Sequence, residues 1–194
     1  MKEREKEWRR KGMKINIKQI WVPLNRISPF LINAVLIAED DKFWHHKGID
    51  YEAMKEALER NLKKKRYAYG ASTITQQLAR NLYLSPKKSI FRKLKEIAIA
   101  IQLEMHLDKR RILYLYLNVA EWGEGIFGAE AASIHYFGKH ASDLTPEEAV
   151  RLAAVLPSPR RHSPLDNSPF VERRAAIIYE IMLKRGIVEH EREL

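Results

Sequence analysis

The sequence contains no cysteine, which excludes disulfide bonds and thiolate metal sites. It also lacks a long hydrophobic run. The longest such run, residues 29–38, is interrupted by Asn33 and is far shorter than the ~20 residues of a membrane-spanning helix. Residues 1–18 carry too many charges to be a signal peptide. We therefore expect that the chain as given does not cross a membrane.

No segment shows the alternating pattern of a β-strand, and we find no internal repeat. A length of 194 residues is enough for one domain with its own core. Lysine and arginine (35) exceed aspartate and glutamate (25), which gives a formal net charge of +10. Such an excess indicates an anionic partner: nucleic acid, an anionic membrane surface or a phosphorylated substrate.

Helix-start signals recur along the chain, and we predict an all-α fold with loops at residues 40–49, 63–73 and 157–167. A serine, threonine or aspartate with proline or glutamate soon after it is typical of a helix N-terminus. These signals occur at Ser28, Asp50, Ser85, Thr145 and Ser168, and Asp108 is predicted to start a further helix. The helix predicted from Ser85 to His106 is expected to bury one apolar stripe, made of Ile90, Leu94, Ile97, Ile101 and Met105.

Glu39 is the first candidate catalytic residue, because it follows an apolar run at the predicted end of a helix. Apolar surroundings raise a carboxyl pKa and prepare it to accept a proton from a sugar hydroxyl. A helix-terminal carboxylate that caps the next loop is the alternative. The loop that follows contains Phe43, His46 and Gly48, and aromatic rings commonly hold sugars. A metal site at the adjacent residues His45 and His46 is weakly supported, since neighbouring side chains point apart.

A polar run, residues 70–77, begins with glycine and supplies uncharged hydrogen-bonding groups suited to a sugar or a phosphate. Downstream, Lys88, Arg92 and Glu96 are spaced four apart and share one helix stripe, with Arg80 expected beside them. This stripe is either a salt-bridged solvent face or a track for a diphosphate. Paired with the polar run, the diphosphate is favoured.

The basic and aromatic loop at residues 63–69 has three interpretations. It is a solvated turn, a nucleic-acid surface, or an anchor on an anionic membrane, where each cation contributes about 1 kcal/mol. The loop alone does not distinguish them.

Four blocks in this order, residues 39–48, 70–77, 92–96 and 109–118, resemble the glycosyltransferase domain of peptidoglycan synthases. The resemblance covers nearly the whole chain, and residues 121–123 are most similar to the monofunctional biosynthetic transglycosylases. It implies a lysozyme-like helical domain at residues 21–188, with a smaller membrane-facing jaw at about residues 50–72. Residues 1–20 would be a charged arm and residues 189–194 a tail.

The resemblance also implies the reaction and its residues. The base, Glu39, would take a proton from the acceptor's 4-hydroxyl, which attacks the lipid-linked end of the growing chain with inversion. Glu96 would orient the substrate or organise the diphosphate. The expected diphosphate and substrate contacts are Arg80, Lys88, Arg92, Lys93, Ser72, Thr73, Gln76, Gln77, Asp40, Phe43, His46, Gly48 and Asn118.

By the same resemblance, the partners would be lipid II, the growing lipid-linked glycan, an anionic membrane surface and other cell-wall synthesis proteins, with no nucleic acid. The location would be the periplasmic or outer face of the bacterial inner membrane. No cofactor is required; a divalent ion, Mg²⁺ or Mn²⁺, is compatible with Glu96, but no dedicated metal cage is visible.

Two features depart from the family pattern: the usual membrane-spanning helix is absent, and arginine and lysine are exchanged at Arg80 and Lys88. Two alternatives stay open. A lysozyme-type muramidase would use Glu39 as an acid but would have no task for the cations. A basic helical nucleic-acid-binding protein would need no catalytic glutamate.

Overall fold

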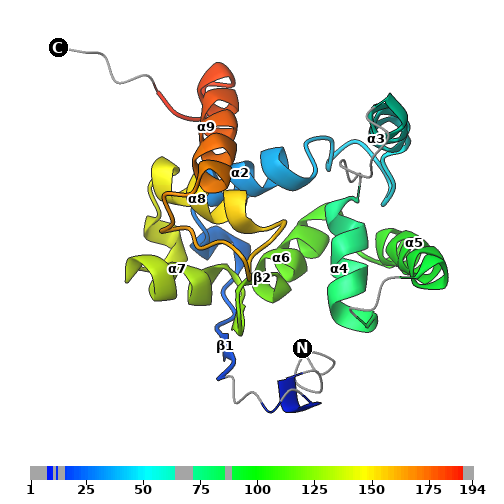
Figure 1. Cartoon of the computed structure of the whole chain (residues 1–194), viewed down its shortest axis with the longest axis horizontal. Coiled ribbons are helices and arrows are strands. Elements are labelled where there is room, and N and C mark those ends of the chain that lie inside the picture. The colour runs from blue at the N-terminus through cyan, green and yellow to red at the C-terminus, as the bar shows by residue number, and fades with distance from the viewer. Residues whose placement is uncertain (1–7, 11, 13–15, 64–71, 86–88, 190–194) are drawn as a thin grey trace.

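The computed structural model describes residues 8–10, 12, 16–63, 72–85 and 89–189, and in these the fold is mostly helical, as predicted. Figure 1 shows the arrangement of the elements. The α-helices are α2 (Pro29–Glu39), α3 (Tyr51–Lys63), α4 (Ile74–Tyr83), α5 (Ile90–His106), α6 (Lys109–Val119), α7 (Ala129–Phe137), α8 (Pro146–Val155) and α9 (Pro169–Lys184). Two short 3-10 helices are η1 (Leu24–Arg26) and η2 (Ala141–Asp143).

Several of these helices begin at the capping residues that the sequence predicts. The side chains of Ser28, Asp108 and Ser168 each accept a backbone N–H of the first turn. Thr145 and Glu148 form a complete capping box at the start of α8. Local side-chain chemistry therefore fixes these starts without help from the rest of the chain.

A small sheet was not predicted. It consists of β1 (Lys18–Gln19), β2 (Glu121–Gly123) and β3 (Ile126–Phe127), in the order β1-β3-β2, with β1 parallel and β2 antiparallel to β3. Strands of two or three residues are too short for an alternating pattern to appear in the sequence. The sequence also predicts a helix from Asp108 that ends at Gly123 or Gly125, and a short helix over residues 126–137. Both helices are shorter in the structure, because residues 121–127 are strand and turn.

The core lies where α2 packs between α8 and α9, with α6 and α7 beside it. Leu31, Leu117, Leu152 and Met182 are among its fully buried side chains. Because α2 is apolar along its length, it passes through this core and carries its last residue, Glu39, to the edge of the core.

A second group of helices lies on the opposite side of the molecule. There α4 packs against α5 and α6, and α3 stands apart at the right of Figure 1. The predicted jaw lobe at about residues 50–72 contains α3. Its boundaries stay a prediction, and residues 64–71, with most of the basic loop, lie outside the described residues.

The prediction for the helix over residues 85–106 was wrong in two respects. α5 begins at Ile90, after the cap Ser89, and its apolar stripe is not buried: Ile90 is 80% exposed and Met105 is 70% exposed. The face that packs inward instead carries Glu96 and Ala100. An apolar stripe at helical spacing identifies one face of a helix, but not what covers that face.

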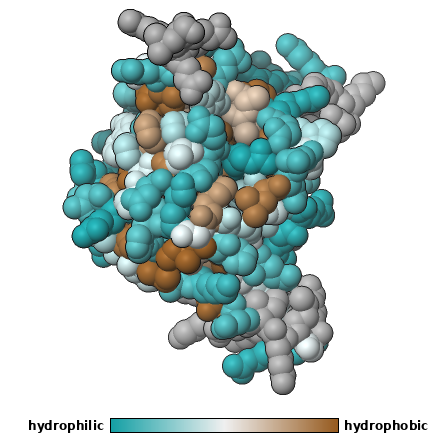
Figure 2. All heavy atoms as spheres, turned by 90° about the vertical axis from the view of Figure 1, so that its left-hand side faces the viewer, coloured by the Kyte–Doolittle hydropathy of each residue, from teal (hydrophilic) through white to brown (hydrophobic). Residues whose placement is uncertain are grey.

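Tyr51 and Leu62 of α3 are also exposed, so large apolar side chains project from two helices on this side. Figure 2 shows the face that carries α7 to α9, where apolar side chains form small patches separated by hydrophilic ones. Among the helices that the structure describes, none is both long enough and apolar enough to span a bilayer.

Gly128, at the start of α7, provides a test of this packing. It has a φ of +85°, and a Cβ there would lie 2.8 Å from the backbone oxygen of Asn118. Gly138 has a φ of +68° with nothing within 4 Å of such a Cβ. We expect Gly138→Ala to cost about 1–2 kcal/mol in urea unfolding, from backbone strain alone. Gly128→Ala should cost about 1–3 kcal/mol more, because the carbonyl cannot move away. Equal costs would contradict this account.

Candidate functional site

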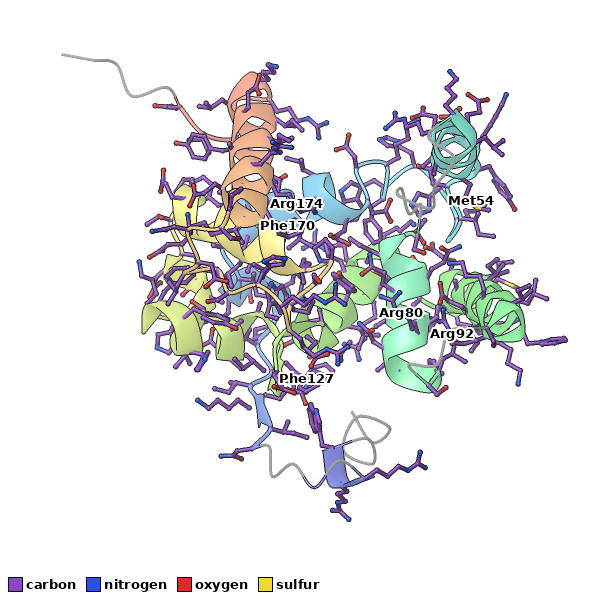
Figure 3. The ribbon with its side chains drawn as sticks, viewed as in Figure 1. Met54, Arg80, Arg92, Phe127, Phe170 and Arg174 are labelled. Atoms are coloured by element: carbon purple, nitrogen blue, oxygen red, sulfur yellow. The ribbon has the colours of Figure 1, made fainter. Side chains whose placement is uncertain are left out.

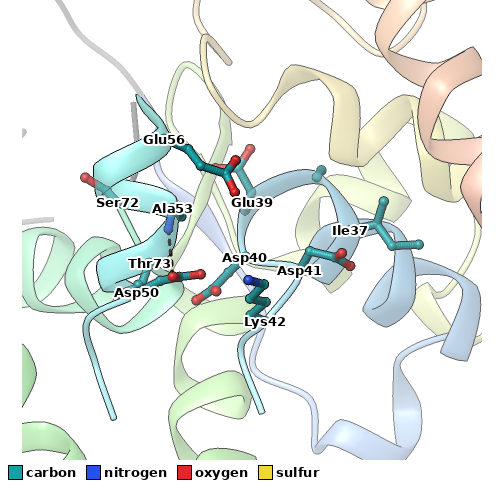
Figure 4. A pocket seen from close by; sticks show the side chains of 11 residues that line it. Ile37, Glu39, Asp40, Asp41, Lys42, Asp50, Ala53, Glu56, Ser72 and Thr73 are labelled. Carbon is teal, nitrogen blue, oxygen red and sulfur yellow. Dashed lines mark hydrogen bonds between the residues drawn. The ribbon is translucent and has the colours of Figure 1, made fainter. Parts of the chain in front are cut away.

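A cleft of about 260 Å³ opens where α2 ends, between that end, α3 and the start of α4 (Figure 4). Most of its lining side chains are polar or charged, and carboxylates are prominent among them. The described residues that line it are Ile37, Ala38, Glu39, Asp40, Asp41, Lys42, Asp50, Ala53, Glu56, Ser72 and Thr73. Four of the predicted site residues, Glu39, Asp40, Ser72 and Thr73, are thus brought to one cleft.

Asp40 joins the end of α2 to the start of α4. Its carboxylate accepts the backbone N–H of Ile74 at 2.8 Å and lies 2.9 Å from Nε2 of His46. The side chains of Asp40 and His46 are both nearly inaccessible to solvent. A carboxylate at a helix N-terminus is favoured by the unpaired N–H groups there. Asp40 and His46 therefore hold the site together at its base.

Glu39 is a largely buried acid of the cleft, with a side chain only 10% exposed. Its Oε2 accepts a hydrogen bond from Nε2 of Gln77 at 2.8 Å. Its Oε1 lies 3.5 Å from a guanidinium nitrogen of Arg174 and has no hydrogen-bond partner among the described residues. Burial raises the pKa of Glu39, although Gln77, Arg174 and Arg80 act in the opposite direction. A carboxylate whose pKa is raised is better suited to accept a proton than an ordinary one.

The polar run is used partly for structure. Thr73 and Gln76 form the capping box of α4, and the Thr73 hydroxyl also donates to the backbone oxygen of Gly48 at 2.7 Å. Gly48 has a φ of +85°, and a Cβ there would lie 3.1 Å from Cγ of Glu104. Close packing and backbone conformation both explain the glycine. Two other residues of the run lie at the cleft: Gln77 bonds to the Glu39 carboxylate, and Ser72 lines the cleft.

A buried ion-pair cluster lies on α5, next to the cleft. Glu96 is 1% exposed, and its two oxygens lie 2.7 Å from Nη1 of Arg92 and 2.5 Å from Nζ of Lys93. Lys93 also donates to Oγ of Ser72 at 2.9 Å, which links the cluster to the cleft wall. Two cations thus share one carboxylate, leaving a net positive charge beside the cleft.

Arg80 of α4 is a further cation of this region, since α4 packs against α5, which carries Arg92; both arginines are labelled in Figure 3. The backbone oxygen of Arg80 accepts from Leu84 at the end of α4, whereas its guanidinium forms no hydrogen bond or ion pair with any residue that the structure describes. Burial raises the pKa of both Glu39 and Tyr116, and the charge of Arg80 opposes that rise in each, so Arg80 lies within electrostatic reach of both. Lys88, the other predicted diphosphate contact, lies outside the described residues.

Two predicted contact residues, Phe43 and Asn118, are buried in the structure. Phe43 is fully buried, with its ring against Trp44 and with Nζ of Lys109 4.4 Å from the ring centre. Asn118 is also fully buried, and its side chain bonds the backbone N–H and C=O of Val22 and the carbonyl of Tyr114. In this arrangement both side chains are occupied by protein contacts.

Sequence reasoning missed Arg174 of α9, which lies beside Glu39 and stacks toward Phe170 (Figure 3). Its Nε donates to the carbonyl of Ala154, which fixes the guanidinium. It also missed Asp41, whose two oxygens pair with the guanidinium of Arg185 at 2.6 and 2.8 Å. No local signal marks either arginine, because each partner is distant in the chain.

Among the residues that the structure describes, no three acidic or histidine side chains gather as a group that could hold a metal ion. Both oxygens of Glu96 are already ion-paired. A divalent ion at Glu96 would have to compete with Arg92 and Lys93, and the expected role of Glu96 toward a metal stays a prediction.

Comparison with known proteins covers most of the chain. A sequence model described as transglycosylase matches residues 8–183. The chain belongs to the transglycosylase family. This transglycosylase is 46% identical over 187 residues to the biosynthetic peptidoglycan transglycosylase of Nitrosospira multiformis, covering 96% of the chain and 81% of the relative. It is 48% identical over 172 residues to that of Dechloromonas aromatica, covering 89% of the chain and 74% of the relative. The resemblance to this family, and with it the lysozyme-like helical fold, is confirmed.

The raised pKa of Glu39 predicts a pH-dependent effect on the stability of the transglycosylase. Folding favours protonated Glu39, so the contribution of this residue is fully present below its unfolded pKa and is lost as pH rises through the folded pKa. We expect the free energy of unfolding of the wild type to fall relative to Glu39→Gln between about pH 4 and about pH 8. Urea unfolding at both pH values measures this. If the wild type were instead more stable relative to Glu39→Gln at about pH 8 than at about pH 4, the pKa of Glu39 would not be raised by folding.

Proposed function

We propose that this transglycosylase polymerises lipid II into β-1,4-linked glycan strands. Glu39 is the general base: it removes the proton from the acceptor's 4-hydroxyl, the oxygen attacks the anomeric carbon of the donor, and undecaprenyl diphosphate leaves. The anomeric configuration is inverted, since attack and departure occur on opposite faces. The observation that carries this proposal is a buried carboxylate of raised pKa beside a group of cations from three helices.

The environment of Glu39 supports the role of base. A sugar hydroxyl is a weak acid, so its base must be stronger than an ordinary carboxylate, and burial provides this. Gln77 and Arg174 keep the ionised form available in spite of the burial. With its Oε1 free of hydrogen bonds to the described residues, the carboxylate retains capacity to accept a proton.

The cations support a diphosphate leaving group. Charge develops on the diphosphate as the glycosidic bond breaks, and Arg80, Arg92 and Lys93 are placed to stabilise it. Ser72 lies between Lys93 and the cleft, where its hydroxyl is available to a phosphate oxygen. A muramidase protonates its leaving group with a carboxylic acid and has no need of such cations. These residues would perform this task without a metal ion.

Glu39→Gln tests the base. Removing a general base costs about 10²- to 10⁴-fold in rate, and we expect a loss of that size in kcat with labelled lipid II in detergent. Glu180→Gln, on the exposed face of α9, is the matched control and should retain full activity. If Glu39→Gln produced glycan strands of normal length at the normal rate, Glu39 would not be the base.

We also propose that the side formed by α3 and α5 rests on the outer face of an anionic cytoplasmic membrane, where lipid II is anchored. The exposed apolar side chains of α5 are Ile90, Phe91, Leu94, Ile101 and Met105. Exposed cations of the same two helices, Lys55, Lys63 and Lys95, would meet anionic head groups. Exposed apolar groups with nearby lysines are typical of a surface that enters the head-group layer.

A vesicle experiment tests this surface. Ile90→Ser combined with Phe91→Ser should weaken binding to phosphatidylglycerol vesicles at least about tenfold, because two large apolar side chains no longer enter the lipid. Ile134→Ser combined with Leu165→Ser removes exposed apolar groups from α7 and the 157–167 loop and should leave binding unchanged. Equal loss in both double variants would point to a non-specific effect of surface hydrophobicity.

A further inference from the structure

Tyr116 of α6 is buried directly behind the candidate base. It is 1% exposed, and its hydroxyl donates to Oε1 of Gln77 at 3.1 Å. The other end of the same amide donates from Nε2 to Oε2 of Glu39 at 2.8 Å. Three side chains from α6, α4 and α2 therefore form one continuous row of hydrogen bonds that ends at the carboxylate.

The direction of these hydrogen bonds follows from the chemistry of the groups. An ionised carboxylate only accepts, so Gln77 must turn its NH₂ group toward Glu39. The amide oxygen then faces Tyr116, which has a proton to donate. Burial raises the pKa of Tyr116 well above its ordinary value, so the hydroxyl keeps its proton over the working pH range.

We propose that Tyr116 is a positioning residue for the base: its hydroxyl holds the Gln77 amide in the orientation that donates to Glu39. The inference rests on the proposed role of Glu39. Without the hydroxyl, the amide oxygen of Gln77 has lost its donor in a buried place, and rotation of the amide is no longer opposed. A rotated amide presents its oxygen to Glu39 and favours the protonated acid, which cannot accept a proton.

The other charges around Glu39 do not depend on Tyr116. Arg174 of α9 and Arg80 of α4 lower the pKa of Glu39, and Asp40 at the end of α2 raises it. Glu56 of α3 lines the same cleft. All of them remain in Tyr116→Phe, so a change in the titration of Glu39 in this variant reports on Gln77.

Carboxyl carbon NMR measures this titration directly, without substrate. In protein labelled with ¹³C at glutamate side-chain carboxyls, the Glu39 signal is the one that disappears in Glu39→Gln. We expect Tyr116→Phe to raise the pKa of Glu39 by about one unit, which is a tenfold change in the protonation equilibrium. Tyr114→Phe removes a half-buried hydroxyl from the same helix and should leave the titration unchanged. An unchanged Glu39 pKa in Tyr116→Phe would overturn the proposal.

A double-mutant cycle separates positioning from a general packing defect. Gln77→Met removes the donor itself and should raise the pKa of Glu39 in the same direction. Because Tyr116 acts only through Gln77, adding Tyr116→Phe to Gln77→Met should produce no further change. Additive changes would show that the hydroxyl acts by another route. If Tyr116→Phe alone unfolds, the double variant and Gln77→Met cannot be compared, and Gln77→Met alone then shows whether loss of the Gln77 donor raises the pKa of Glu39.

The rate of lipid II polymerisation against pH is the functional readout. The base works when ionised, so a higher pKa moves the acidic limb of the kcat profile to higher pH, with most activity recovered on the plateau. An equal loss at every pH would instead indicate a structural defect and contradict positioning. Suppose that Glu39→Gln polymerises lipid II normally while Tyr116→Phe still raises the pKa of Glu39 in the NMR titration. The proposed role of Glu39 as the base would then be wrong, but the positioning of Gln77 by Tyr116 would be supported.

Discussion

The site depends on the buried carboxylate of Asp40 at the N-terminus of α4. One bond to the backbone of Ile74 fixes where α4 begins relative to the end of α2. Glu39 precedes Asp40 by one residue and Gln77 follows Ile74 by three, so this one contact determines whether base and amide meet. His46 closes the arrangement by pairing with the same carboxylate. If Asp40 were free to move, neither Glu39 nor Gln77 would have a defined place.

The parts of the fold that could be predicted from the sequence are those decided within a few residues. The caps at Ser28, Thr145 and Ser168 are of this kind, since donor and acceptor lie within one turn. Glu39 could be proposed because an apolar run leads directly to it. Its contact with Gln77 spans 38 residues, and the one with Arg174 spans most of the chain, so neither follows from local chemistry.

The apolar stripe of α5 shows a different limit. Its spacing correctly predicted that the apolar side chains share one face, but the prediction that this face is buried was wrong. A face that meets lipid and a face that meets a protein core require the same side chains, so spacing alone does not distinguish them. Asn118 and Phe43 show the converse, since residues that family resemblance associates with substrate are held inside the protein. The resemblance identifies positions that matter to a peptidoglycan transglycosylase without specifying whether each acts on the substrate or on the fold.

The gathering of cations around Glu39 and Glu96 has a consequence for product release. In the proposed reaction Glu39 takes up a proton, so the cleft loses a negative charge while Arg80, Arg92, Lys93 and Arg174 keep their positive charges. The electrostatic attraction for a departing anion therefore increases just as the bond to it breaks. Return of that proton to water restores the negative charge and weakens the hold. The proposed role of Glu39 therefore implies that loss of the proton and departure of the anionic product are coupled, and that a turnover is complete only when both have left.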